Sequence, residues 1–244
     1  MLETPKAEQL DKSRIISKIL SPALRLWLRS QVEHVEDVQF KISGGDRKIL
    51  SGNISTVSIA ASHAVYQGLH LSNIQLEGSG IRVNLGQVIK GKPLRLLEPV
   101  PVAGQLLLQK SDLQASLESP LLSNALTEFL DVLLKSNGIT NLREDLKERP
   151  INWQQIDIDT GQVTIMGTLL DAVLGAMPIV IRAGIQLATA QELRLHPLQI
   201  EIPPKLPSRQ LDAFQVDLGP EVDIQELTLT PEQLMCRGRL MVMP

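Results

Sequence analysis

The residues with the clearest potential for chemistry are two carboxylates, Asp157 and Asp159, followed by Thr160 and Gly161. Two carboxylates held close together can share a proton and divide the roles of general acid and general base, as in aspartic proteases. However, Gln162 stands where a Ser or Ala is usual, and the sequence shows neither a second copy of the motif nor a flap. A Thr-Gly turn between two strands explains the same residues without catalysis. The motif is therefore weak evidence for a hydrolase.

Other reactive residues do not form a recognisable constellation. The four histidines, His34, His63, His70 and His196, are scattered without metal-ligand spacing. A nucleophile elbow, a phosphate-binding loop and a dinucleotide-binding glycine motif are all missing from the sequence. The one cysteine, Cys236, excludes an internal disulfide and a cysteine-built zinc site. We therefore expect a non-enzymatic protein without a metal or cofactor.

The composition narrows the choice of ligand. Of the 244 residues, 43% are hydrophobic and only 2% are aromatic, and the net charge is −3. Sugars and single-stranded nucleic acids usually need aromatic stacking platforms, and nucleic acids also need a basic surface. The chain thus has ample material for a core, and nucleic acid is not expected as a partner.

Alternating apolar and polar residues recur in pairs of short segments separated by turn residues. This pattern is typical of antiparallel hairpins with one dry face. It predicts three hairpins, which are 74–76 with 81–85, 193–195 with 198–202, and 224–229 with 234–242. Residues 78–80 are interpreted as the turn of the first. Further strands are predicted at 38–42, 54–59, 69–76, 102–108, 151–158, 163–166 and 179–187, with a helix or wide connection at 169–176 and a loop at 203–207.

The dry face of these strands is almost wholly aliphatic. Such a surface can close on itself as a core, or it can hold a long aliphatic ligand.

Two helical regions interrupt the strands. After a disordered start at 1–10, residues 11–34 are predicted to form an amphipathic helix that Pro22 kinks or splits. The second region has a short helix at 111–119 and then a helix over 120–134, with Ser119 as its N-cap, Pro120 at its first position and Gly138 as its stop. The apolar residues of 120–134 cover most of its circumference, as expected for a helix wrapped by other elements.

The N-terminal helix carries five basic and no acidic residues between Lys12 and Ser30. This favours a helix that docks on a membrane surface, although a helix packed on the sheet with solvated charges fits the same pattern. The predicted membrane-contact residues are Arg14, Lys18, Leu20, Leu24, Arg25, Trp27, Leu28 and Arg29. We find no secretory signal and no apolar run of about 18 residues that would span a bilayer. A cytoplasmic, peripherally membrane-associated protein is expected.

The order of these elements resembles the LmeA-like family of bacterial phospholipid-binding proteins. The resemblance begins with Ser21-Pro22-Ala23-Leu24-Arg25-Leu26-Trp27-Leu28 and continues through 38–42 and 44–47, 68–85, 111–117 and the closing hairpin 219–242. It covers nearly the whole chain and contains no catalytic fingerprint. Several family members carry an export signal or anchor, and the type without one resembles the cyanobacterial branch.

The resemblance implies an α+β fold related to tubular lipid-binding domains. A strongly curved antiparallel sheet would wrap around a long apolar helix in one domain over 35–244 and leave an apolar groove. The expected partners are a phospholipid or glycolipid and a membrane surface, with any protein partner left open. The predicted lipid-binding residues are Leu122, Leu126, Phe129, Leu130, Leu133, Ile54, Ile59, Leu76, Val83, Ile165 and Ile181. The alternative is a self-packed protein-interaction module without a lipid ligand.

Overall fold

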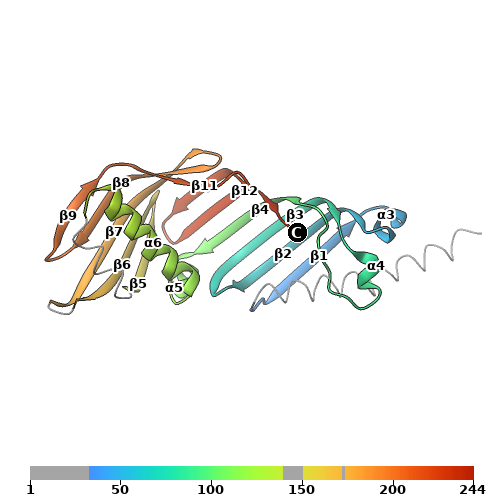
Figure 1. The fold of residues 1–244 in the computed structure, drawn as a ribbon, viewed down its shortest axis with the longest axis horizontal. Coiled ribbons are helices and arrows are strands. Elements are labelled where there is room, and N and C mark those ends of the chain that lie inside the picture. Colours follow the sequence, from blue (N-terminus) through green and yellow to red (C-terminus); the bar gives the residue numbers. More distant parts are fainter. Residues whose placement is uncertain (1–32, 140–150, 172–173) are drawn as a thin grey trace, which may run out of the picture. The chain divides into compact units, whose positions relative to one another are not determined.

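The computed structural model describes residues 33–139, 151–171 and 174–244 (Figure 1). The predicted start at 1–10 and the predicted amphipathic helix lie outside these residues, apart from the last two residues of that helix. The first described strand, β1, spans Asp37–Ser43 and pairs antiparallel with β2, with Phe40 opposite Ile59.

The described strands form two six-stranded sheets (Figure 1). The first has the order β1, β2 (Asn53–Tyr66), β3 (Leu69–Arg82), β4 (Val100–Gln109), β12 (Gln233–Val242) and β11 (Val222–Thr230). The second has the order β10 (Phe214–Asp217), β8 (Glu192–Ile202), β7 (Gly175–Thr189), β6 (Gln162–Asp171) and β5 (Ile151–Asp159), with β9 (Leu206–Leu211) paired to β8. The antiparallel, β-rich class is confirmed, and the prediction of a single sheet is wrong.

The described residues pack into two compact units, each built from separate segments of the chain. Unit 1 comprises the residues up to Ala64, Asn73–Gln105 and Arg239–Pro244, and unit 2 comprises Val65–Ser72 and Leu106–Gly238. The expectation of one lipid-binding domain over 35–244 stays a prediction.

Four helices are described, and the longest was predicted closely. They are α3 (Asp46–Leu50), α4 (Leu85–Val88), α5 (Lys110–Ser116) and α6 (Pro120–Ser136). At the start of α6 the Oγ of Ser119 accepts a hydrogen bond from the backbone N–H of Leu122 at 3.0 Å, as an N-cap does. Gly138 follows the helix with φ +70°. The cap, the first-turn proline and the glycine stop are therefore confirmed.

Two of the three predicted hairpins are wrong. β3 runs without interruption from Leu69 to Arg82, through Gly78 and Gly80, and β8 runs from Glu192 to Ile202 through Pro197. A Cβ on Gly78 would lie 3.2 Å from the Cδ1 of Ile81, so this glycine is in a tightly packed strand position. The residues between the predicted strands, 78–80 and 196–197, were interpreted as turns, but both stretches lie inside long strands.

The third predicted hairpin is confirmed as β11 and β12, which are neighbours in the first sheet. The segment 169–176 is neither a helix nor a wide connection, because β6 extends to Asp171 and β7 begins at Gly175. The loop expected at 203–207 ends earlier, at the start of β9, and β10 was not predicted.

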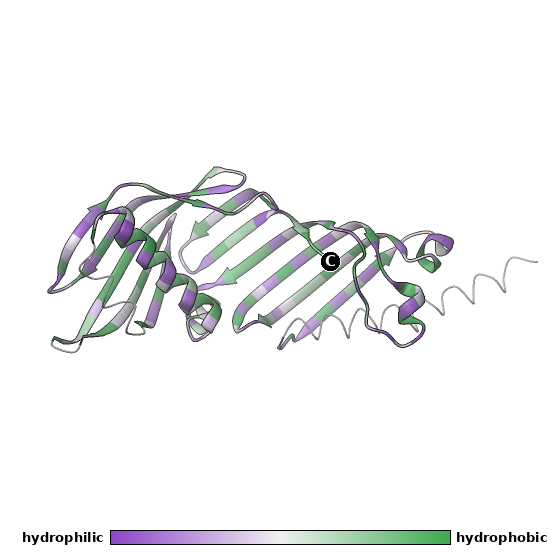
Figure 2. Cartoon of the chain, viewed as in Figure 1, coloured by the Kyte–Doolittle hydropathy of each residue, from purple (hydrophilic) through white to green (hydrophobic). Residues whose placement is uncertain are grey.

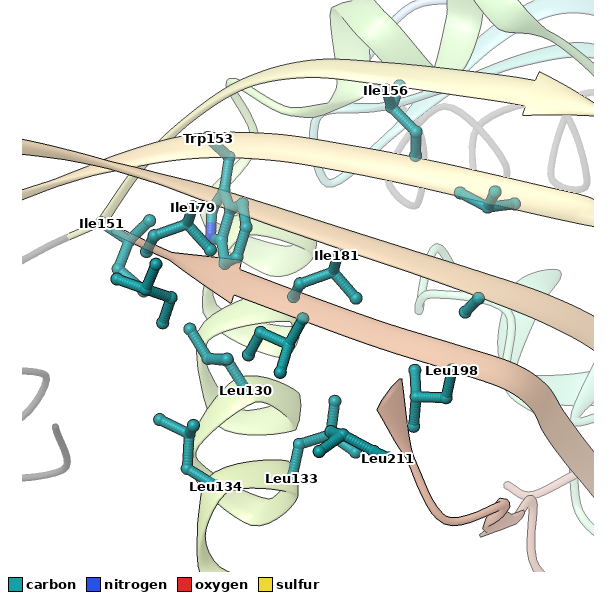
Figure 3. Packing of buried hydrophobic residues seen from close by; sticks show 14 of the residues in the cluster. Leu130, Leu133, Leu134, Ile151, Trp153, Ile156, Ile179, Ile181, Leu198 and Leu211 are labelled. Carbon is teal, nitrogen blue, oxygen red and sulfur yellow. The ribbon is translucent and has the colours of Figure 1, made fainter. Parts of the chain in front are cut away.

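Each unit has its own hydrophobic core. Hydrophobic and hydrophilic residues alternate along the strands, and the hydrophobic ones contribute to these cores (Figure 2). The core of unit 1 contains Ile49, Ile54, Val57, Ile81, Val83, Leu85, Leu94 and Val100. In the larger core of unit 2, leucines of α6 face the isoleucines of β5 and β7 (Figure 3). It is this second core that places the predicted helix against a sheet.

Candidate functional site

The burial of α6 changes along its length. Near its C-terminal end, Leu130, Leu133 and Leu134 are fully enclosed in the core of unit 2 (Figure 3). Toward its N-terminal end, Leu122 and Leu126 pack against the same core but remain half-buried. They lie on one face of the helix, since positions four residues apart share a face. The core is therefore closed at one end of the helix and incompletely covered at the other.

A half-buried position also occurs in the middle of the second sheet. Ile165 of β6 pairs with Ile156 of β5 and Ile181 of β7, and Ile181 pairs in turn with Ile200 of β8. The other three members of this row are buried, whereas Ile165 is only half-buried. We call Leu122, Leu126, Phe129 and Ile165 the half-buried layer.

Polar and aromatic contacts fix α6 over this sheet. The indole Nε1 of Trp153 on β5 donates a hydrogen bond to the Oγ1 of Thr127 at 3.1 Å. Trp153 is opposite Gly167, where a Cβ would lie 2.9 Å from the indole Cε3, so the glycine makes room for the ring. The rings of Phe129 and Phe214 of β10 pack edge-to-face, with their centroids 5.7 Å apart. The half-buried layer thus rests on a fixed framework.

The short helix α5 protects the outer edge of β5. The side-chain amide of Gln114 donates to the carbonyl of Gln154 at 2.7 Å and accepts from the backbone N–H of Ile156 at 3.1 Å. One side chain therefore makes the two bonds that a neighbouring strand would make, which keeps this edge from pairing elsewhere.

The tip of the β2–β3 hairpin is anchored to the α5–α6 corner within unit 2. The Oγ of Ser116 accepts from the backbone N–H of His70 at 2.8 Å, and Ser72 donates to the Asp112 carboxylate. At Gly68, with φ +75°, a Cβ would lie 2.6 Å from the Cβ of Ser119, so a larger residue would push against the helix cap.

The two carboxylates with catalytic potential have structural partners. Asp157 lies 2.5 Å from the Nζ of Lys110 and also accepts a hydrogen bond from the amide of Gln155 at 2.6 Å. The bond to Lys110 lowers the pKa of Asp157 and raises the pKa of Lys110. Asp159 accepts from the backbone N–H of Thr160 at 2.7 Å.

Asp159 and Gln162 pair across the β5–β6 hairpin, so Thr160 and Gly161 form its turn. The interpretation as a Thr-Gly turn is confirmed, and the carboxylates act in ion pairing and turn formation.

The predicted lipid-binding residues do not come together in one cluster. Seven belong to or pack against the core of unit 2, and they are Leu122, Leu126, Phe129, Leu130, Leu133, Ile165 and Ile181. Ile54 and Val83 are buried in the core of unit 1, and Ile59 packs against it. Leu76 is half-buried and packs closely over Gly104, because a Cβ added to this glycine would lie only 2.9 Å from the Cδ2 of Leu76. Their role as a lipid site stays a prediction.

Other half-buried apolar residues pack against the core of unit 2 and were not predicted as part of the site. They are Leu113, Ile139, Ile185, Phe214, Leu227 and Leu234. Phe214 alternates with Val216 in a short strand, a signal too brief to separate from a loop. The predicted membrane-contact residues from Arg14 to Arg29 lie outside the described residues.

A search for relatives gives one family. A model of the LmeA-like phospholipid-binding family matches residues 11–239. The chain belongs to this family. No curated protein and no solved structure matches it. The resemblance found in the sequence is thereby confirmed, while its cyanobacterial type stays a prediction.

The LmeA-like family description names phospholipid binding and no reaction. This is compatible with a non-enzymatic protein. Among the helices that the structure describes, none is long and apolar enough to cross a membrane.

Proposed function

We propose that the chain binds phospholipid without catalysis, with acyl chains lying against the half-buried layer of unit 2. The observation that carries this proposal is the change in burial along α6, together with the half-buried Ile165 in a row of buried residues. Aliphatic side chains left partly exposed beside a closed core offer an apolar contact surface without polar competition. Membership of a phospholipid-binding family supplies the ligand class.

The energetics favour exchange at a membrane over release into water. Each buried methylene contributes about 0.8 kcal/mol, so two sixteen-carbon chains represent a gross transfer energy of about 25 kcal/mol. Dissociation into water would then be too slow to be useful. We therefore propose that loading and unloading occur during reversible docking on a membrane, and that Arg14, Lys18, Arg25 and Arg29 bring the N-terminal segment to anionic headgroups.

The first experiment identifies the ligand directly. The protein is purified from its own host without detergent, extracted with organic solvent, and the extract is analysed by mass spectrometry. A near-stoichiometric phospholipid or glycolipid is the expected result and names the lipid class. A clean extract would shift the conclusion to a self-packed protein.

A pair of substitutions locates the site. Leu126→Trp fills the space beside the half-buried layer, and the loss of two methylene contacts, about 1.6 kcal/mol, predicts at least a tenfold weaker binding of a fluorescent phospholipid. Leu121→Trp makes the same change at a 43% exposed position of the same helix and serves as the control. Equal binding by both variants would contradict this placement of the site.

Removal of residues 1–30 tests transfer separately. We expect the shortened protein to keep its bound lipid but to exchange it between liposomes more slowly, because the basic segment no longer concentrates it at anionic membranes. Unchanged transfer by a folded shortened protein would refute the docking role.

The alternative is a self-packed module that binds a protein partner through the N-terminal segment. It is favoured by the complete burial of Leu130, Leu133 and Ile181, which lipid cannot touch unless the core opens. The extraction experiment separates the two, since the alternative predicts no co-purified lipid.

A further inference from the structure

A loop of unit 1 is held in one conformation by its own side chains. Residues 85–97 contain α4 and lie between β3 and β4, and we call them the basic loop. The buried side-chain amide of Asn84 donates to the carbonyl of Pro93 at 3.0 Å, and its Oδ1 accepts from the backbone N–H of Arg95 at 2.8 Å. Leu85 and Leu94 are buried in the core of unit 1. The loop therefore presents a defined set of side chains to solvent.

These outward side chains combine positive charge with exposed aliphatic surface. Lys90, Lys92 and Arg95 are exposed, and residues 83–97 include no acidic residue, although the net charge of the chain is −3. Among the residues that the structure describes, no ion pair includes any of these three cations. Ile89 is 56% exposed next to them, in a turn that is hydrogen-bonded back to α4. This combination fits a partner that offers negative charge and apolar material together.

Helix α3 adds residues of the same kinds to this end of unit 1. Its last turn carries Arg47 and Lys48, both exposed, and Leu50 is 40% exposed. The carbonyl of Gly52 accepts from the N–H of Val83 at 2.9 Å, and a Cβ on this glycine would lie 3.8 Å from the Cβ of the first residue of α4. The end of α3 therefore lies against the start of α4 (Figure 1). We call the exposed residues of α3 and of the basic loop the basic patch.

The residue types of the basic patch favour a membrane over other anionic partners. The centres of protein interfaces are enriched in aromatic residues, Met and Arg and depleted in Lys. The patch has three lysines and no aromatic residue or methionine. A nucleic-acid backbone would neutralise the cations but leave Leu50 and Ile89 in water. At a membrane surface, lysines reach the headgroup phosphates while neighbouring aliphatic side chains enter the interface.

We propose that the basic patch of unit 1 docks on a membrane that contains anionic phospholipid, with Lys90 and Lys92 at the headgroup phosphates and Ile89 in the interface. This contact is separate from the basic N-terminal segment, and it does not depend on whether unit 2 holds a lipid. Because charge and apolar surface both contribute, the loss of either weakens docking.

The first test measures flotation of the full-length protein with vesicles of equimolar phosphatidylcholine and phosphatidylglycerol. K90Q/K92Q is compared with K135Q/R209Q, which removes two exposed cations from unit 2 and leaves the same net charge. A basic residue near an anionic membrane strengthens binding about fivefold. We therefore expect the apparent partition coefficient of K90Q/K92Q to fall roughly tenfold or more, and that of the control to fall less than about threefold. Equal losses in the two variants would overturn the proposal.

The second test addresses the apolar part of the patch. Ile89→Ser is compared with Val132→Ser, whose side chain is 46% exposed on α6. We expect Ile89→Ser to weaken vesicle binding about threefold or more and Val132→Ser to leave it unchanged. If the wild-type protein ignored these vesicles but bound single-stranded DNA or an acidic protein through Lys90 and Lys92, the membrane would be the wrong partner.

A labelled protein keeps the proposal testable even if a variant folds poorly. In a Cys236→Ser background, Ile89→Cys carries an environment-sensitive fluorophore, and the vesicles should shift its emission to the blue. A label that stays in water on vesicle-bound protein would contradict the proposal. Native lipid extracted from K90Q/K92Q should match the wild-type amount, because the basic patch lies outside unit 2. This proposal and the lipid-binding proposal can therefore fail independently.

Discussion

At the scale of single residues, the carboxylates that first suggested catalysis are explained by their neighbours. Asp157 is held by Lys110 and Gln155, and Asp159 shapes the turn that Thr160 and Gly161 complete. A general acid needs a pKa raised toward the working pH, but the bond to Lys110 moves the pKa of Asp157 downward. The ion pair joins the start of α5 to β5 and so belongs to the framework of unit 2.

The pH dependence of this pair follows from the two shifts. The lowered pKa of Asp157 means that its contribution is present above the ordinary aspartate pKa and is lost as the pH falls through the lowered value. The raised pKa of Lys110 means that its contribution is present below the ordinary lysine pKa and is lost as the pH rises through the raised value. The pair therefore stabilises the fold in the broad window between them.

Lys110→Met should return the pKa of Asp157 toward its ordinary range, as measured by NMR titration of the side-chain carboxyl. The variant should be less stable than wild type at neutral pH, and the difference should vanish in acid once Asp157 is protonated. Glu232→Gln, which removes the more distant carboxylate at 3.9 Å, should shift the Asp157 pKa little. An unchanged Asp157 pKa in Lys110→Met would show that the pair does not persist in solution.

At the scale of elements, the edge of β5 depends on one side chain. Gln114→Leu would leave the carbonyl of Gln154 and the N–H of Ile156 without their partner. At about 0.5–1.5 kcal/mol for each lost hydrogen bond, we expect the free energy of unfolding to fall by about 1–3 kcal/mol in urea titrations. The open edge should also increase aggregation, measured by light scattering.

Gln199→Leu is the matched control for this substitution. It removes the hydrogen bond that the Gln199 side-chain amide donates to the Oγ of Ser208 at 2.6 Å. Because this bond joins two side chains, its loss leaves no backbone N–H or carbonyl of a strand without its partner. A loss of stability as large as that of Gln114→Leu would show that the edge bonds have no special role.

Helix α6 was predictable because its signals are local. A capping serine, a first-turn proline, an apolar stripe and a stop glycine all lie within about twenty residues. The continuity of β3 and β8 was not predictable, because Gly78 packs beside Val100 and Val102 and Pro197 lies beside Gly184 of β7, contacts that the local sequence does not show. Pattern alone also could not show that Ile165 and Ile54 belong to different cores, since both alternate in the same way along their strands.

At the scale of the whole molecule, two hydrophobic cores divide the predicted lipid-binding residues. Leu126 and Ile165 stay half-buried beside the core of unit 2, whereas Ile54 and Val83 are buried within the core of unit 1. The proposed function therefore assigns unequal roles to the two units. Under this proposal unit 2 offers the acyl-chain contact, whereas Ile54 and Val83 of unit 1 are enclosed by their own core.

This difference predicts where bound lipid stabilises the chain. A ligand that binds only the folded state adds RT ln(1 + [L]/Kd) to its stability, which is about 2.7 kcal/mol at a hundredfold excess over Kd. Local protection from hydrogen exchange rises most where the ligand covers the chain. We expect reloading of delipidated protein with phospholipid to slow exchange in peptides covering 122–129 and 162–167 more than in peptides covering 53–59 and 81–85. If the peptides of unit 1 gained equal or greater protection, the acyl chains would have to be placed against Ile54, Ile59, Leu76 and Val83 instead.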